Sequence, residues 1–191
     1  MSRAPEYVAY ARMDELHALQ QPRSNARGEL NFLLLSHVKE LLFRAVTDDL
    51  DTARSALRAD DVDGACRSLA RAGRTQGVLV ACWESLNGMS ADEFAAFRHV
   101  LNDASGMQSF AYRTLEFVMG NRPPSMVEVA RADGHPMPLA ELDRPSIYEE
   151  ALRFLSRQGH LVPDATAAER PEVDRRVEDV WLEIYRRPEH H

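Results

Sequence analysis

The chain has 191 residues, of which 45% are hydrophobic and 28% charged, and this balance suits one sizeable core in a single soluble globular domain. Its net charge of −7 and its lack of a basic cluster argue against nucleic acid or an anionic membrane as the main partner, because phosphate binding needs a concentrated positive surface. Ala, Leu, Arg and Glu dominate, and isoleucine occurs only at Ile147 and Ile184, which favours helix over strand. We therefore expect an all-α protein.

Two long helices are predicted first along the chain. Ser24 and Asn25 offer N-caps for a helix over roughly 29–58, and a second over roughly 62–87 ends at Gly88. The turn between them is short. The two helices should therefore pack antiparallel.

Shorter helices follow. The capping box SADE at 90–93 opens a helix to about 102, and the segment 107–120 supplies another that stops at Gly120. Five prolines divide residues 123–145, which we interpret as a loop region.

Two more helices are predicted beyond this loop region. Ser146 and Glu149 form a second capping box for a helix to about 158. Pro171 suits the first position of a final helix, whose apolar face carries Val173, Val177, Val180, Trp181 and Ile184. An apolar face so close to the last residue suggests that the chain is cut short.

The stretch NFLLLSHVKELLF, residues 31–43, raises a specific question. Its apolar residues cover almost the whole circumference of a helix, which predicts burial on most sides. Ser36 and His37 lie side by side in the middle of this stretch, and polar groups inside such a helix need a reason.

The two cysteines and the hydropathy bear on location. Cys66 and Cys82 lie sixteen residues apart in one predicted helix, too far along its axis to bridge each other, which favours a reduced compartment. No signal peptide or transmembrane run is present in this sequence. We expect the protein in the cytoplasm.

Common motifs of catalysis are missing from the sequence. It has no Gly-rich phosphate loop, no Cys-rich metal spacing and no His-x-x-Glu-His pattern, and its histidines are scattered. Four segments are informative instead, namely EYVAYARMDELHALQQPRS, NFLLLSHVKELLF, ASGMQSFAYRTLEFVMGN and RPSIYEEALRFLSRQGHLVP.

These segments, in this order, resemble the tryptophan 2,3-dioxygenase superfamily of haem enzymes. The family helix E-M-L-F-x-x-x-H-Q-x-x-E-L-W aligns without gaps on residues 29–42. The hallmark S-G-F-Q-S-x-Q-[YF]-R-x-x-E-x-x-x-G-N is matched over residues 105–121. The resemblance spans essentially the whole chain.

The resemblance implies a fold and an assembly. It implies one all-α helical bundle over residues 1–191, with the family's C-terminal helices missing from this chain. Residues 28–191 would form the helical core, and residues 1–27 would reach a neighbouring subunit of a homo-oligomer, a tetramer in the family.

Ser36 takes the place of the family's distal histidine. That histidine lies four residues after the helix phenylalanine, and Ser36 follows Phe32 at this distance, whereas His37 takes the place of the neighbouring glutamine. One residue is about 100° of rotation, so His37 cannot simply substitute. For His37 the alternative is a core or interface histidine with one satisfied nitrogen, and for Ser36 a small residue that allows close packing.

The resemblance assigns substrate contacts as well. Arg113 matches the arginine that holds the substrate carboxylate, and Phe32 would line the indole site. The alternative for Arg113 is an ion pair with Glu116 or a cap on another helix. Tyr7 and Tyr10 match tyrosines that enter a neighbouring subunit's pocket, and Ala11 replaces a pocket leucine there.

Haem b is the cofactor that the resemblance implies, yet no axial ligand is found in these residues. The family's axial histidine aligns beyond the last residue, so the role is not assigned to His190 or His191. His99, His135 and His160 are formally available but match no such position.

Two functions remain open. The first is a haem-dependent oxygenase, of secondary metabolism, that inserts oxygen into the indole ring of L-tryptophan or a related indole or aromatic amino acid, with Ser36 on the oxygen-binding side. The second is a non-catalytic or haem-free helical assembly module derived from the same fold. Arg113 favours the first, and the missing axial ligand favours the second.

Overall fold

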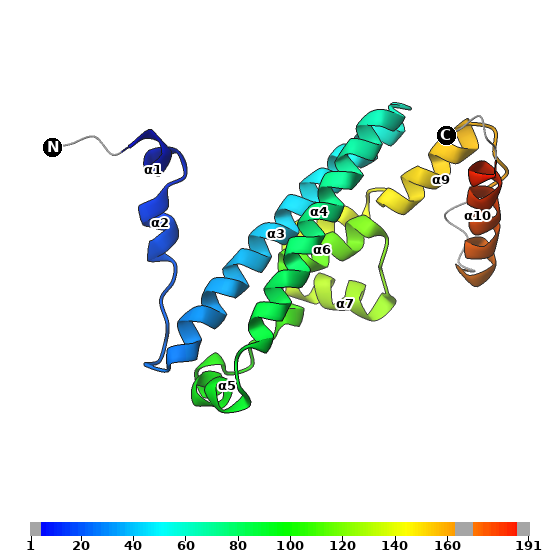
Figure 1. Ribbon diagram of the computed structural model, residues 1–191. Coiled ribbons are helices and arrows are strands. Elements are labelled where there is room, and N and C mark those ends of the chain that lie inside the picture. Colours follow the sequence, from blue (N-terminus) through cyan, green and yellow to red (C-terminus); the bar gives the residue numbers. More distant parts are fainter. Residues whose placement is uncertain (1–4, 163–169, 187–191) are drawn as a thin grey trace.

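The structure is a computed structural model that describes residues 5–162 and 170–186, in which every regular element is a helix (Figure 1). The α-helices are α1 (Glu6–Tyr10), α2 (Met13–Ala18), α3 (Arg27–Arg58), α4 (Val62–Asn87), α5 (Ala91–Arg98), α6 (Phe110–Met119), α7 (Pro124–Asp133), α8 (Pro136–Leu142), α9 (Ile147–Arg157) and α10 (Arg170–Tyr185). Two 3₁₀ helices, η1 (His99–Leu101) and η2 (Gly106–Gln108), join α5 to α6. The all-α prediction is confirmed.

Helices α3 and α4 form an antiparallel pair at the centre of the fold (Figure 1). The buried residues of α3 recur at heptad spacing in its second half, at Phe43, Val46, Leu50, Ala53 and Leu57. This spacing keeps one stripe of the helix toward its neighbours. Small buried residues on α4, namely Ala65, Ser68 and Ala72, let the two backbones approach closely.

Helix α6 completes the core against this pair. Ala111, Leu115 and Val118 pack into the cluster of buried side chains that α3 and α4 supply. Gly120, with φ +97°, then ends the helix in the left-handed region, as predicted.

Both predicted capping boxes are present. Ser90 caps α5, with Glu93 reaching back to its N–H, and Ser146 caps α9 with Glu149 in the same way. The start of α3 differs from the prediction, since its N-cap is Ala26 and Ser24 instead bonds to Glu29.

The interpretation of residues 123–145 as a loop region is wrong. Pro124 and Pro136 each occupy the first turn of a helix, α7 and α8, where a missing N–H costs no hydrogen bond. His135 caps α8, because its Nδ1 accepts from the Met137 N–H at 3.3 Å.

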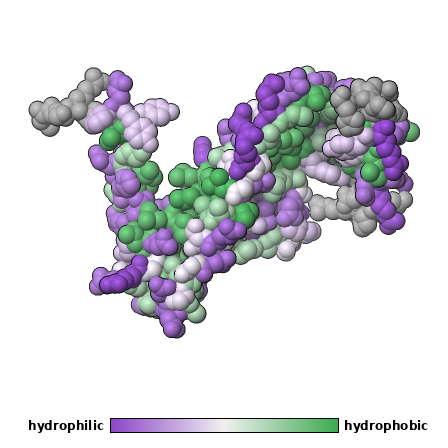
Figure 2. All heavy atoms as spheres, in the orientation of Figure 1, coloured by the Kyte–Doolittle hydropathy of each residue, from purple (hydrophilic) through white to green (hydrophobic). Residues whose placement is uncertain are grey.

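The expected burial of residues 31–43 is also wrong for the described residues. Only Phe43 is buried in that stretch, and Leu34, Val38 and Leu41 are exposed. The reason is that α6 and α9 pack against the second half of α3, whereas α5 covers only part of its first half. Figure 2 shows the resulting apolar surface between the N-terminal segment and the body.

The two ends of the described chain lie outside the central bundle. Helices α1 and α2 stand beside the first half of α3, and α10 lies next to the end of α9 (Figure 1). Val177 and Val180 of α10 are buried, whereas Trp181 and Tyr185 are exposed. Val173 lies outside the residues whose side chains are described.

Candidate functional site

The first half of α3 carries the predicted distal position. Ser36 is half-buried, and its hydroxyl donates to the Phe32 carbonyl one turn earlier at 2.8 Å. The ring of Phe32 packs against Phe94 and Phe97 of α5, with centroids at 5.8 and 5.5 Å. Phe32 and Ser36 share one face of α3 because they are four residues apart, and on this face the Phe32 ring joins the aromatic side chains of α5.

His37 faces a different neighbour. Its Nδ1 lies 3.2 Å from Nε2 of Gln20, in the segment that follows α2. The half-buried ring thus has one satisfied nitrogen, as the structural alternative for His37 supposed. Its neighbours Leu34 and Leu41 are exposed, so the residues that the structure describes do not enclose it in a core.

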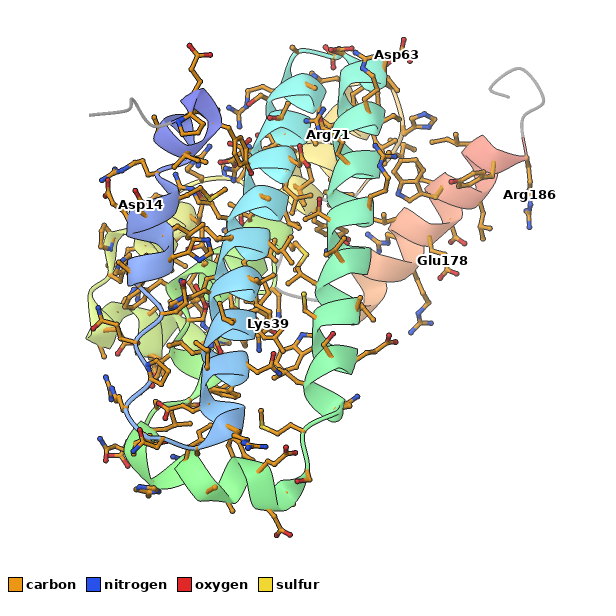
Figure 3. The ribbon with its side chains drawn as sticks, turned by 60° about the vertical axis from the view of Figure 1, so that its left-hand side comes forward. Asp14, Lys39, Asp63, Arg71, Glu178 and Arg186 are labelled. Carbon is orange, nitrogen blue, oxygen red and sulfur yellow. The ribbon has the colours of Figure 1, made fainter. Side chains whose placement is uncertain are left out.

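Lys39 is the single lysine of the chain and lies on the side of α3 that faces α4 (Figure 3). Its ammonium group sits 3.8 Å from the ring centroid of Trp83. Partial burial lowers the pKa of Lys39, and the nearby Cys82 and Glu40 oppose that shift. This contact links α3 to the last turns of α4.

Arg113 lies on α6, which packs against α3 beyond Ser36. The ring of Tyr112 contacts Phe43 at a centroid distance of 5.3 Å, and Phe43 follows Ser36 by two turns, about 10 Å along the axis. The structure thus brings the helices of Ser36 and Arg113 together without a contact between the two side chains.

The guanidinium of Arg113 is buried and partnered. Its Nη1 donates to Glu116 at 2.5 Å, and its Nη2 reaches the Met107 carbonyl at 3.5 Å. The ion pair that was the structural alternative for Arg113 is therefore formed. Arg113 has five N–H donors, so this pair does not exhaust its capacity to bind a carboxylate.

A small cavity adjoins Arg113 between α6, α7 and α8. Its volume of about 10 Å³ holds at most one water and is far below the roughly 300–1,000 Å³ of typical ligand pockets. Phe110 and His135 form part of its wall and stack with centroids 3.6 Å apart. Sequence reasoning missed this stack, although the histidine before Pro136 was a signal for a capped helix.

Tyr7, Tyr10 and Ala11 lie away from these residues. Tyr7 and Tyr10 on α1 are 68% and 90% exposed, and Ala11 follows that helix. Within one chain they do not complete a pocket with Ser36 or Arg113. Large exposed aromatic side chains on a short helix are typical of a surface that binds a partner.

A haem site needs apolar walls and a ligand for the iron. The face of Phe32 and Ser36 fits one wall of a flat apolar group. The exposed Leu34, Val38 and Leu41 lie on roughly the opposite side of α3 and are not part of this wall. Residues 5–162 and 170–186 contain no group of three His, Cys, Asp or Glu side chains that could hold a metal ion, and His37 is turned toward Gln20. A haem iron needs only one protein ligand, so these residues account for one wall of a haem site and leave its iron ligand unassigned.

The sequence comparisons decide the family. The sequence model of the family "Tryptophan 2,3-dioxygenase" matches residues 1–142. The chain belongs to the tryptophan 2,3-dioxygenase family.

Curated relatives carry the same name. Tryptophan 2,3-dioxygenase 1 of Ralstonia nicotianae is 34% identical, across 100% of this chain and 67% of the relative. Tryptophan 2,3-dioxygenase of Erythrobacter litoralis is 35% identical, across 100% of this chain and 75% of the relative. The enzyme of Bordetella pertussis is 35% identical, across 98% and 68%. The chain thus spans about two thirds to three quarters of the length of these tryptophan 2,3-dioxygenases.

Proposed function

We propose that the protein is a haem-dependent oxygenase that inserts oxygen into the indole ring of L-tryptophan or a related indole or aromatic amino acid. One observation carries the proposal: in a chain of the tryptophan 2,3-dioxygenase family, a buried arginine with spare N–H donors, Arg113, stands at the motif position for carboxylate binding. An arginine fork binds a carboxylate in a bidentate fashion, which orients an amino acid.

The other residues have supporting roles in this proposal. Phe32 lines the indole site, and Ser36 stands on the oxygen-binding side, where its short side chain leaves more room than a histidine. Its hydroxyl donates to the Phe32 carbonyl and can still accept a hydrogen bond. Bound haem b would supply the activation of dioxygen. The larger space beside Ser36 and Ala11 favours a substrate or an outcome different from plain tryptophan cleavage, as in secondary metabolism.

The assembly and location extend the proposal. Residues 1–27 carry Tyr7, Tyr10 and Ala11 to the pocket of a neighbouring copy in a homo-oligomer, a tetramer by resemblance. The cytoplasm suits the two unpaired cysteines, Cys66 and Cys82. None of the helices in the described part of the chain is long and apolar enough to cross a membrane.

A second candidate function is a haem-free assembly module with the same fold. The pairing of Arg113 with Glu116 favours it, because that pairing accounts for the arginine without a ligand. In that case the apolar face of α3 and the tyrosines of α1 would serve only contacts between copies.

Titration of L-tryptophan into the Arg113→Lys variant distinguishes the oxygenase from the assembly module. Lysine keeps a cation beside Glu116 but loses the planar fork, so the lost charged hydrogen bond of roughly 1.5–3 kcal/mol should raise the Kd about 10- to 100-fold. The melting temperature should change little. Arg131→Lys, at an exposed position on α7, is the matched control. Equal binding by Arg113→Lys would assign Arg113 to structure.

A further inference from the structure

Glu116 stands at the centre of a hydrogen-bonded cluster on α6. One carboxylate oxygen accepts from Arg113 Nη1 at 2.5 Å, and the other accepts from Asn121 Nδ2 at 3.1 Å. The side chains of Arg113 and Glu116 are only 6% and 12% exposed. The pair is therefore largely shielded from water, where an ion pair is stronger and better ordered than at the surface.

Tyr112 joins the same cluster from the preceding position. Burial, and then the negative charge of Glu116 and a hydrogen bond to its carboxylate, raise the pKa of Tyr112. The Tyr112 ring also packs against Phe43 of α3. The cluster is thus tied to the rigid pair of long helices, so Glu116 has a fixed position from which to hold another group.

The orientation of the Arg113 guanidinium depends mainly on Glu116. A second hydrogen bond, from Arg113 Nη2 to the Met107 carbonyl, is 3.5 Å long and therefore weak. An arginine side chain that is free to change rotamer loses entropy when it binds a ligand, and a side chain that is already held loses less.

We propose that Glu116 is a positioning residue that holds the guanidinium of Arg113 in the orientation in which its remaining N–H groups bind the carboxylate of an amino-acid substrate. This inference rests on the proposed role of Arg113 as the carboxylate-binding residue. Glu116 itself touches no substrate in this arrangement, because both of its oxygens are directed to Arg113 and Asn121.

Two explanations of the pair predict opposite effects of removing the charge of Glu116. If Glu116 only competes with a substrate carboxylate for Arg113, removing the charge of Glu116 frees the guanidinium and strengthens the local positive charge. A carboxylate should then bind more tightly. If Glu116 positions Arg113, its removal lets the guanidinium swing, so a carboxylate should bind more weakly.

The test uses two probes that differ in the carboxylate, L-tryptophan and tryptamine, titrated by calorimetry into the purified full chain. The quantity measured is the ratio of the Kd for tryptamine to the Kd for L-tryptophan. We expect Glu116→Gln to lower this ratio at least tenfold, with little change in the Kd for tryptamine. Glu128→Gln removes an exposed acid from α7 and should leave the ratio unchanged. A loss of packing alone would weaken both probes together and leave the ratio in place.

The outcomes separate the inference from the proposed function. If Arg113→Lys lowers the ratio but Glu116→Gln keeps or raises it, Arg113 binds the carboxylate and the positioning role of Glu116 is wrong. If the unaltered protein does not distinguish the probes, the proposed role of Arg113 fails and the inference fails with it. Should Glu116→Gln not fold, Asn121→Ala removes the second hydrogen bond to Glu116, and a ratio equal to that of the unaltered protein would overturn the inference.

Discussion

Arg54 of α3 and Glu141 of α8 form an ion pair inside the protein, with Nη1 and Oε2 2.8 Å apart although 87 residues separate them in the sequence. Their side chains are 1% and 6% exposed. The same nitrogen donates to the Pro145 carbonyl at 2.8 Å, and Arg144 holds the other oxygen of Glu141 at 2.6 Å. This network fixes α8, and through it one wall beside Arg113, to the long helix α3.

Removal of one partner from this pair should destabilise the protein strongly. Arg54→Leu leaves the buried carboxylate of Glu141 with the half-exposed Arg144 but without its buried cation, so the free energy of unfolding should fall by about 3 kcal/mol. Denaturant unfolding gives this value. Arg71→Leu breaks the exposed pair with Asp49 and should cost about 1 kcal/mol or less. Equal losses in the two variants would show that burial does not set the strength of the Arg54 pair.

Ser36 and His37 should respond differently to substitution. If Ser36 faces the haem, Ser36→His restores a family-like distal site and changes the absorption spectrum of the ferrous protein with bound carbon monoxide. His37→Ala should leave that spectrum alone and act through the lost contact with Gln20. The opposite pattern, with haem uptake abolished by His37→Ala and Ser36→His silent, would mean that the alignment of α3 is wrong by one residue.

Acid should loosen the start of α3. Glu29 accepts from the Ser24 hydroxyl, and its oxygens also accept from the N–H groups of Arg23 at 2.5 Å and Ser24 at 2.7 Å. The bond from the Ser24 hydroxyl, followed by that from the Arg23 N–H, holds the pKa of Glu29 below its ordinary value. Because the folded-state pKa lies below the unfolded-state pKa, this stabilisation is complete above the unfolded value and is lost as the pH falls through the folded value.

Melting temperatures between pH 7 and pH 3 test this effect. The difference between the unaltered protein and Glu29→Gln should be largest near neutral pH and should shrink in acid. Glu84→Gln, at an exposed position on α4, should follow the unaltered protein throughout. A difference for Glu29→Gln that does not change with pH would contradict the role of the Glu29 carboxylate.

The protein should form a homo-oligomer through its N-terminal segment. Tyr10 is 90% exposed on α1, and the nearby face of α3 carries Leu41 at 57% exposure, so both surfaces need a partner. Light scattering should show an assembly, a tetramer by resemblance, that becomes smaller when residues 1–19 are removed. Val62→Ser, at the exposed first residue of α4, should leave the mass of the assembly unchanged. A stable monomer of the full chain would contradict this prediction.

The sequence predicted the elements with strong local signals. The capping boxes at Ser90 and Ser146 and the terminating Gly120 are all in place, because each depends only on residues within one helical turn. The helices α7 and α8 were missed because a proline at the first position of a helix was interpreted as a loop residue.

The candidate site was harder to predict for a physical reason. The contacts of Arg113 with Met107 and of His37 with Gln20 join different elements, and no local pattern encodes them. The exposure of Leu34 and Leu41 was also unpredictable, since an apolar stripe on a helix shows that a surface needs cover and not whether the same chain supplies it.

The absorption spectrum of the purified protein, taken with its intact mass, distinguishes a haem-dependent oxygenase from a haem-free assembly module. After expression with ample haem, we expect an intense Soret band from one haem per chain, and a shift of that band when L-tryptophan is added. The intact mass shows the length of the chain that gives this spectrum. A protein of the same intact mass that folds, assembles and takes up no haem would contradict the account and identify the chain as an assembly module.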